Sequence, residues 1–259
     1  MRPDIPKFET KAELFNWLRE NKDDILYQKK SEFKMADGFC ANVGQLKDLN
    51  VSKADNTDSE VVKVRAIINT TYIRDSHKDV HIDGIWKKTL QENKRIKHLQ
   101  EHQMSFTKII ADKEDLRAFT KKYDWKELGY DVEGKTEALV FDSTVKKSRN
   151  AEMFKEYKEG NVDNHSVGMH YVKIKFAMDS TEEDDEDLKA EFDKHIDKIA
   201  NKEEVQKDGY FWAVYEAKAI EGSAVPMGSN QITPTLNIPK ENIIKENLHE
   251  KAIKNWLTK

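Results

Sequence analysis

One serine of the chain has an unusual setting for a strand residue. The stretch GNVDNHSVGMHYVKI, residues 160–174, places Ser166 directly after His165, with Gly168 and His170 following. A serine hydroxyl is a weak nucleophile near neutral pH and needs an adjacent base, most often an imidazole. Successive residues of a strand point to opposite faces, so His165 cannot serve Ser166 directly. If Ser166 is a nucleophile and not a structural strand serine, its base must come from elsewhere in the chain.

A second set of candidate residues consists of two histidine pairs spaced four apart. HLQEH, from His98 to His102, fits the H-x-x-E-H pattern, in which two histidines on one helix face bind zinc and Glu101 acts as base. Apolar and β-branched residues precede HLQEH and no helical stripe runs through it, which is unfavourable to zinc. His77 and His81 have the same spacing in an Asp-rich segment, where a solvated turn is the simpler interpretation.

The apolar pattern predicts the elements that would position these side chains. Thr10 and Glu13 form a capping box that begins a helix extending to about residue 29. NAEMFKEYKEGN, residues 150–161, predicts a short helix ended by Gly160. Strands are predicted over 60–70, around 96–99, on both sides of a turn at 112–115, in TEALVFDST, after Gly160 and over 210–225.

Charge is distributed unevenly along the chain. Seven acidic residues fall within DSTEEDDED, residues 179–187. The segment that follows has a helical pattern with one apolar face, formed by Leu188, Phe192, Ile196 and Ile199. We interpret residues 179–208 as an acidic helical insertion that buries this face.

The composition limits the class of protein. The 259 residues include 44 basic and 48 acidic ones, a net charge of −4, whereas a dedicated nucleic-acid binder normally has a basic surplus. Cys40 is the single cysteine, which excludes an intrachain disulfide and fits a reducing compartment. No apolar run approaches the roughly 18 residues of a membrane span, and the N-terminus lacks an apolar signal core.

Together these patterns predict an α+β protein built on a mostly antiparallel, barrel-like β-sheet surrounded by helices. Residues 1–59 are expected to form an N-terminal helical extension and linker. Residues 60–235 form the main domain with the insertion at 179–208, and residues 236–259 form a C-terminal amphipathic helix.

Three segments of the main domain, in this order, resemble the phage prohead (capsid maturation) protease family, whose fold is similar to the herpesvirus assemblin. They are DSHKDVHIDGIWKKTL…RIKHLQEHQ (75–103), MFKEYKEGNVDNHSVGM (153–169) and YEAKAIEGSAVPMGSNQIT (215–233). Their shared features are an Asp-rich loop with a strand ending in Leu-x-x-His, then Ser-Val-Gly on a strand, then Glu-x-Ser-x-Val. Lys78 and the pair Asp83–Gly84 depart from the family pattern, but not at a proposed catalytic position.

The resemblance implies a serine endopeptidase with a Ser-His-Glu triad and an acyl-enzyme intermediate. The family's catalytic histidine falls on His102, its nucleophile on Ser166 and its supporting carboxylate on Glu221. Ser223 faces the same side of its strand as Glu221. A hydrogen bond near the site is one interpretation of this serine, and an ordinary strand serine is the favoured one.

The resemblance also implies the biological setting. A capsid or scaffold protein would be the substrate during phage prohead maturation, in the host cytoplasm within the procapsid. Self-processing and a homodimer or higher oligomer are further expectations. No metal, cofactor, membrane or direct nucleic-acid contact is expected. Two alternatives stay open: a zinc-dependent hydrolase built on HLQEH, and a non-enzymatic capsid-assembly or scaffold-like protein.

Overall fold

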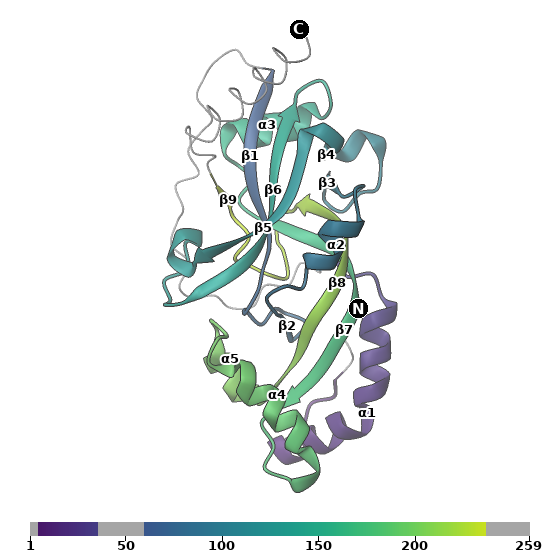
Figure 1. Ribbon diagram of the computed structural model, residues 1–259, viewed down its shortest axis with the longest axis vertical. Coiled ribbons are helices and arrows are strands. Elements are labelled where there is room, and N and C mark those ends of the chain that lie inside the picture. Colours follow the sequence, from purple (N-terminus) through teal and green to yellow (C-terminus); the bar gives the residue numbers. More distant parts are fainter. Residues whose placement is uncertain (1–4, 36–59, 237–259) are drawn as a thin grey trace, which may run out of the picture.

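Two β-sheets organise the residues that the computed structural model describes, which are 5–35 and 60–236 (Figure 1). The first sheet has four strands in the order β5-β6-β1-β9, and all its neighbouring strands run antiparallel. Its strands are β1 (Val61–Thr70), β5 (Leu116–Asp124), β6 (Lys135–Lys146) and β9 (Thr235–Leu236).

The second sheet is built on the long strand β8 (Tyr210–Ala224). Strand β7 (His165–Met178) runs antiparallel along one edge of β8. Two short strands, β2 and β3, lie parallel to β8 along its other edge, and β4 pairs antiparallel with β3. Their bounds are β2 (Asp79–His81), β3 (Lys97–Gln100) and β4 (Ile109–Ala111).

The α+β class predicted from the sequence is confirmed, but the barrel-like closure is not. Within the described ranges the strands form two separate sheets and no closed barrel. The second sheet is mixed, because β2 and β3 pair in parallel with β8, from which more than a hundred residues of chain separate each of them. Pairing between segments so far apart in the chain leaves no local signal in the sequence.

Helices lie at the ends and sides of the sheets. Over the described residues they are α1 (Lys11–Ser31), α2 (Lys87–Glu92), α3 (Ala151–Glu159), α4 (Glu186–Ile196) and α5 (Lys202–Asp208). The predicted capping box begins α1, since Thr10 Oγ1 accepts from Glu13 N at 3.2 Å and the Glu13 carboxylate accepts from Thr10 N. Gly160 ends α3 with a φ of 77°, as predicted. None of these helices has the length and apolar character that crossing a bilayer requires.

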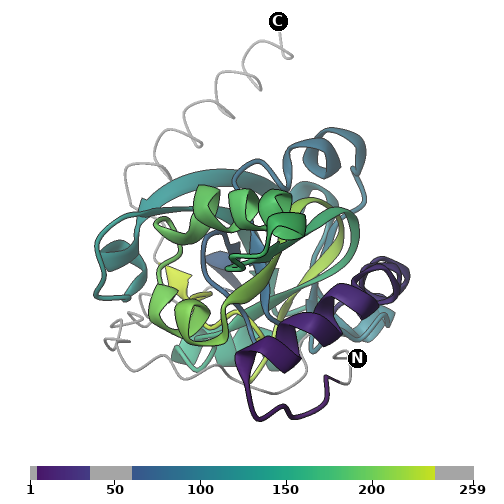
Figure 2. The same cartoon turned by 90° about the horizontal axis from the view of Figure 1, so that it is seen from below.

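The acidic insertion is helical, as predicted. Its helices α4 and α5 lie beside α1 at one end of the molecule, where they cover the lower part of the β7–β8 pair (Figures 1 and 2). Phe192, Ile196 and Ile199 are buried, and Leu188 packs against the core. Arg19 of α1 contacts Asp185 at the start of the insertion, with Nε and Oδ2 2.9 Å apart. The predicted linker with Cys40 and the C-terminal helix lie outside the described residues.

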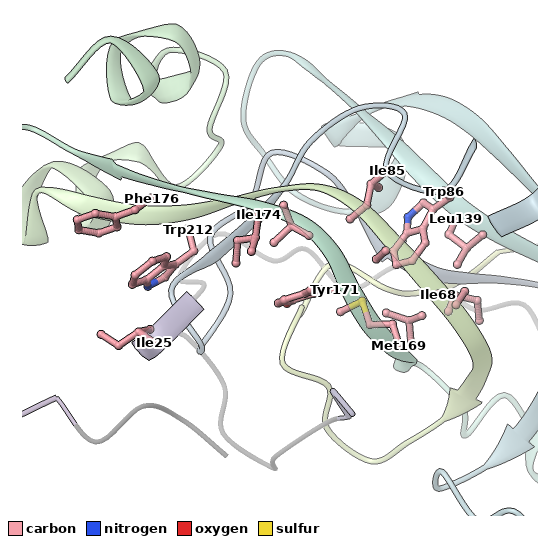
Figure 3. Packing of buried hydrophobic residues seen from close by; sticks show 14 of the residues in the cluster. Ile25, Ile68, Ile85, Trp86, Leu139, Met169, Tyr171, Ile174, Phe176 and Trp212 are labelled. Carbon is pink, nitrogen blue, oxygen red and sulfur yellow. The ribbon is translucent and has the colours of Figure 1, made fainter. Parts of the chain in front are cut away.

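The largest hydrophobic cluster joins the two sheets and α1 (Figure 3). Trp212 of β8 and Phe176 of β7 have ring centroids 4.5 Å apart, with Ile25 of α1 close to them. Ile68 and Leu139 reach the same cluster from the first sheet. Each fully buried side chain of this size stabilises the fold by about 1.5–3 kcal/mol. The shared core therefore fixes the second sheet, and the long β7–β8 pair in it, against the first.

Candidate active site

The register of β7 against β8 sets the first part of the site. Ser166 lies directly opposite Ser223, and Gly168 lies directly opposite Glu221. In an antiparallel pair, directly opposite residues project to the same face, and so do residues two apart on one strand. Ser166, Glu221 and Ser223 therefore share one face of the β7–β8 pair. Ser166 itself is 8% exposed.

His102 reaches this face from a tight turn after β3. Glu101 and His102 have φ angles of 51° and 57°, and Gln103 N donates to Gln100 O at 3.0 Å. Two consecutive positive φ angles define a turn of the I′ kind, which glycine or asparagine normally occupies. The left-handed conformation costs these residues on the order of 1 kcal/mol each. Glu101 N donates to Ala224 O at 2.9 Å, which fastens the strained turn to the end of β8.

The imidazole of His102 contacts the carboxylate of Glu221. Nδ1 of His102 and Oε1 of Glu221 are 2.6 Å apart, and the two side chains are only 8% and 1% exposed. A carboxylate accepts from Nδ1–H, so this contact holds the neutral ring in the tautomer whose Nε2 carries the lone pair. That tautomer is the one a general base needs.

A glycine on the neighbouring strand makes room for this carboxylate. A Cβ atom added at Gly168 would lie 2.0 Å from Oε1 of Glu221 and 2.7 Å from the ring of Phe33. The carboxylate therefore extends from β8 over Gly168 of β7, the strand that also carries Ser166. Ser166 is two residues from Gly168 along β7, which is about 7 Å. Phe33, which covers this point, belongs to the N-terminal extension outside the resemblance.

The structure thus brings two of the three predicted residues into direct contact, and places the third beside them. His102 and Glu221 are hydrogen-bonded, although they are far apart in the chain. Ser166 lies on the same face of the adjacent strand. The interpretation of Ser223 as an ordinary strand serine is wrong. Its hydroxyl donates to Oε2 of Glu221 at 2.5 Å and accepts from the backbone N–H of His102 at 3.0 Å.

The geometry that the zinc alternative requires is not present. HLQEH begins on strand β3 and ends in the I′ turn, so His98 and His102 do not share a helix face. Nδ1 of His98 contacts Ser143 Oγ at 2.9 Å, and Nε2 contacts Tyr157 OH at 3.1 Å, so both ring nitrogens have protein partners. Across the described ranges, no group of three or more His, Cys, Asp or Glu side chains is arranged to hold a metal ion.

His98 belongs to a buried series of hydrogen bonds that joins side chains of β6, β3, α3 and β7. Nδ1 of His165 donates to the carbonyl of Thr233 at 2.8 Å, so in the neutral ring Nε2 accepts from Tyr157 OH at 3.0 Å. The Tyr157 oxygen then accepts from His98 Nε2–H, and His98 Nδ1 accepts from Ser143. Every donor has an acceptor without any ionised group. Burial lowers the pKa of His165 to about 4, which keeps this ring neutral.

A further buried network replaces the solvated turn predicted around His77 and His81. Asp79 forms an ion pair with Lys29 of α1 and accepts from Tyr171 OH at 2.8 Å. The rings of His81 and Tyr171 are T-shaped, with Nε2 and OH 3.3 Å apart. The prediction failed because the partner, Lys29, comes from a helix fifty residues earlier, and no local pattern shows that it is buried.

Asp75 lies in the same network, next to a small pocket. Its carboxylate accepts from the backbone N–H groups of His77 and Asp79, at 2.8 and 3.0 Å. Burial and then the charge of Asp79 raise the pKa of Asp75 to about 7. The pocket has a volume of about 20 Å³, and Asp75, His77, Tyr171 and Ser166 are among its lining residues. That volume is enough for roughly one water molecule.

We compared the chain with known protein families, with curated proteins and with solved structures. No family model matches it, and none of the curated proteins or solved structures matches it significantly.

Proposed function

We propose that the protein is a serine endopeptidase. In this proposal Ser166 is the nucleophile, His102 is the general base and then the general acid, and Glu221 orients the imidazole. The observation that carries the proposal is the 2.6 Å contact between His102 Nδ1 and Glu221 Oε1, on the sheet face that also holds Ser166. A buried imidazole–carboxylate pair beside a strand serine is the arrangement that activates a hydroxyl for acyl transfer.

The reaction follows from these roles. Glu221 holds Nδ1–H, so Nε2 of His102 accepts the proton of Ser166 as Oγ attacks the carbonyl carbon of the peptide bond. His102 then gives this proton to the leaving amine, the C–N bond breaks, and an ester on Ser166 remains. Water attacks the ester with His102 again as base, which releases the acid and restores the hydroxyl of Ser166.

The substrate class in the proposal comes from the resemblance. A capsid or scaffold protein is cleaved during phage prohead maturation within the procapsid, with self-processing and assembly into a homodimer or higher oligomer. We also propose that the two sheets, packed around their common core, correspond to the barrel-like fold of the family that the motifs resemble. A non-enzymatic assembly protein is the outcome if no cleavage occurs.

A fluorophosphonate probe tests the proposal without knowledge of the substrate, because it labels only serines that are activated as nucleophiles. We expect the wild-type chain to gain one adduct, which peptide mass spectrometry locates at Ser166. Ser166→Ala should lose the label and leave the melting temperature within a few degrees, because only one hydroxyl is removed. Ser143→Ala, which removes a buried hydroxyl from another strand, is the matched control and should keep the label.

Cleavage itself is then measured by co-expression with candidate capsid and scaffold proteins. Ser166→Ala should abolish the cleavage, and a metal chelator should leave it unchanged. The proposal is wrong if the wild-type chain takes no label and cleaves none of these proteins. If chelation stops cleavage while Ser166→Ala does not, a metal-dependent hydrolase replaces it.

A further inference from the structure

We propose that Ser223 is a positioning residue, whose single hydroxyl holds both the carboxylate and the backbone of the His102–Glu221 pair. This inference rests on the proposed function for its catalytic consequence, but its structural part stands on contacts alone. Ser223 contacts both His102 and Glu221, and it lies on β8 opposite Ser166. Ser223 is the serine of the Glu-x-Ser-x-Val pattern, but the resemblance implies no role for it.

The hydrogen bonds of Ser223 assign its proton. A hydroxyl has one O–H donor and oxygen lone pairs that accept. The carboxylate of Glu221 can only accept, so Ser223 donates to Oε2 at 2.5 Å. The backbone N–H of His102 can only donate, so Ser223 accepts from it at 3.0 Å. The hydroxyl is fully buried, and its proton is held by a carboxylate, which is unsuitable for a nucleophile.

These two bonds restrain the parts of the pair that would otherwise move. Oε1 of Glu221 is held by the His102 ring and Oε2 by Ser223, so the plane of the carboxylate cannot rotate about its terminal bond. His102 occupies a left-handed backbone conformation with a φ of 57°, which is unfavourable without an anchor. The bond from its N–H to Ser223 supplies that anchor. Loss of the hydroxyl removes one restraint from the carboxylate and one from the turn, which Glu101 N–H still fastens to Ala224 O.

Misplacement of a catalytic group by about 1 Å can cost on the order of 100-fold in rate. We therefore expect Ser223→Ala to slow fluorophosphonate labelling of Ser166 by about 10- to 100-fold. Ser223→Thr keeps the hydroxyl and suits a strand, so it should restore the rate to within about threefold. Ser143→Ala is the matched control. It also removes a buried strand hydroxyl that bonds a histidine, but that histidine is His98 and not a member of the His102–Glu221 pair, so labelling should stay within about twofold of wild type.

A second measurement does not depend on activity. The Nδ1–H of His102, when held by Glu221, should give a sharp downfield proton resonance in a spectrum of the ¹⁵N-histidine-labelled protein. Ser223→Ala should broaden or remove this resonance, Ser223→Thr should retain it, and Ser143→Ala should not affect it. If circular dichroism shows that Ser223→Ala is unfolded, Ser223→Cys is measured in its place. A thiol fills the same space with a weaker donor, so an intermediate loss is expected.

The outcomes separate the two proposals. If the wild type takes no label but the resonance depends on Ser223 as described, the peptidase proposal fails and the positioning role stands. If Ser223→Ala labels at the wild-type rate and keeps the resonance, the positioning role is wrong. A wild-type adduct located on Ser223 in place of Ser166 also overturns it.

Discussion

His98 and His102 lie close together in the sequence, on a strand and in the turn that follows it, yet their surroundings differ in kind. His98 lies in a chain of neutral groups that begins at a serine hydroxyl and ends at a backbone carbonyl. His102 lies against a carboxylate, on a strained turn at the edge of the sheet. Both rings are buried and hydrogen-bonded. The difference between them is the acceptor: a neutral network can hold strands together, whereas an imidazole–carboxylate pair can also move a proton.

The comparison shows that burial and histidine content do not identify a reactive site. The chain of Ser143, His98, Tyr157 and His165 contains a serine, two histidines and a tyrosine, the residue types of many active sites. All its donors are used within it, so none remains for a substrate. The His102–Glu221 pair instead lies on the face that holds Ser166. Substitutions in the two regions should therefore affect different properties.

The largest effect is expected from Glu221→Gln. The amide keeps the size of the side chain but removes the charge, and its NH₂ group can turn the imidazole to the wrong tautomer. Fluorophosphonate labelling of Ser166 should fall by about 10³- to 10⁴-fold. The measurement is the labelling rate of folded protein. A rate within tenfold of wild type would remove Glu221 from the proposed mechanism.

Tyr157→Phe is the corresponding change in the neutral network. It leaves His98 Nε2 and His165 Nε2 without their common partner, and each unsatisfied buried group costs about 1–3 kcal/mol. We expect the free energy of unfolding, measured by urea titration, to fall by about 2–6 kcal/mol. The labelling rate per folded molecule should stay within about threefold. A large loss of rate without loss of stability would contradict the separation of the two regions.

The smallest effect concerns pH. The pKa of His165 is lowered by burial to about 4, from an ordinary value of 6.5, so the unfolded chain takes up the proton first as the pH falls. The wild type therefore loses stability from this group between about pH 6.5 and pH 4, by about 2 kcal/mol at pH 5. His165→Asn abolishes this loss, so its destabilisation relative to wild type should be about 2 kcal/mol smaller at pH 5 than at pH 7.

Urea unfolding of both proteins at the two pH values measures this difference. Asp75 acts in the opposite direction, because its raised pKa makes the folded state bind the proton first, but it is present in both proteins and cancels. An unchanged difference between pH 7 and pH 5 would mean that His165 is not held neutral.

Local patterns predicted most of the secondary structure. The capping box of α1, the glycine that ends α3 and the apolar alternation of β1 are set by neighbouring residues, so they can be read without tertiary information. The apolar face of the acidic insertion was likewise predicted and is buried. The parallel pairing of β2 and β3 with β8 was not predicted, because it depends on how distant segments pack.

The candidate site likewise combines features that the sequence predicted with features that it did not predict. Motif order singled out His102, Ser166 and Glu221, and their catalytic roles remain a proposal. It included Ser223 in the Glu-x-Ser-x-Val pattern but gave this residue no role, because one of its partners lies in a turn more than a hundred residues away along the chain. It also missed the burial of His77 and Asp79, which depends on Lys29 of α1.

The amino-acid sequence by itself determined the local elements, the α+β class and the small set of residues able to do chemistry. These properties follow from short-range sterics, periodicity and side-chain type. Only the tertiary structure decided that His102 faces a carboxylate while His98 faces a tyrosine. Hydrogen-bond partners and burial depend on the register of β7, β8 and β3 and on the turn that reverses the chain at His102. A contact of 2.6 Å between residues 102 and 221 is a property of that packing, and no local pattern encodes it.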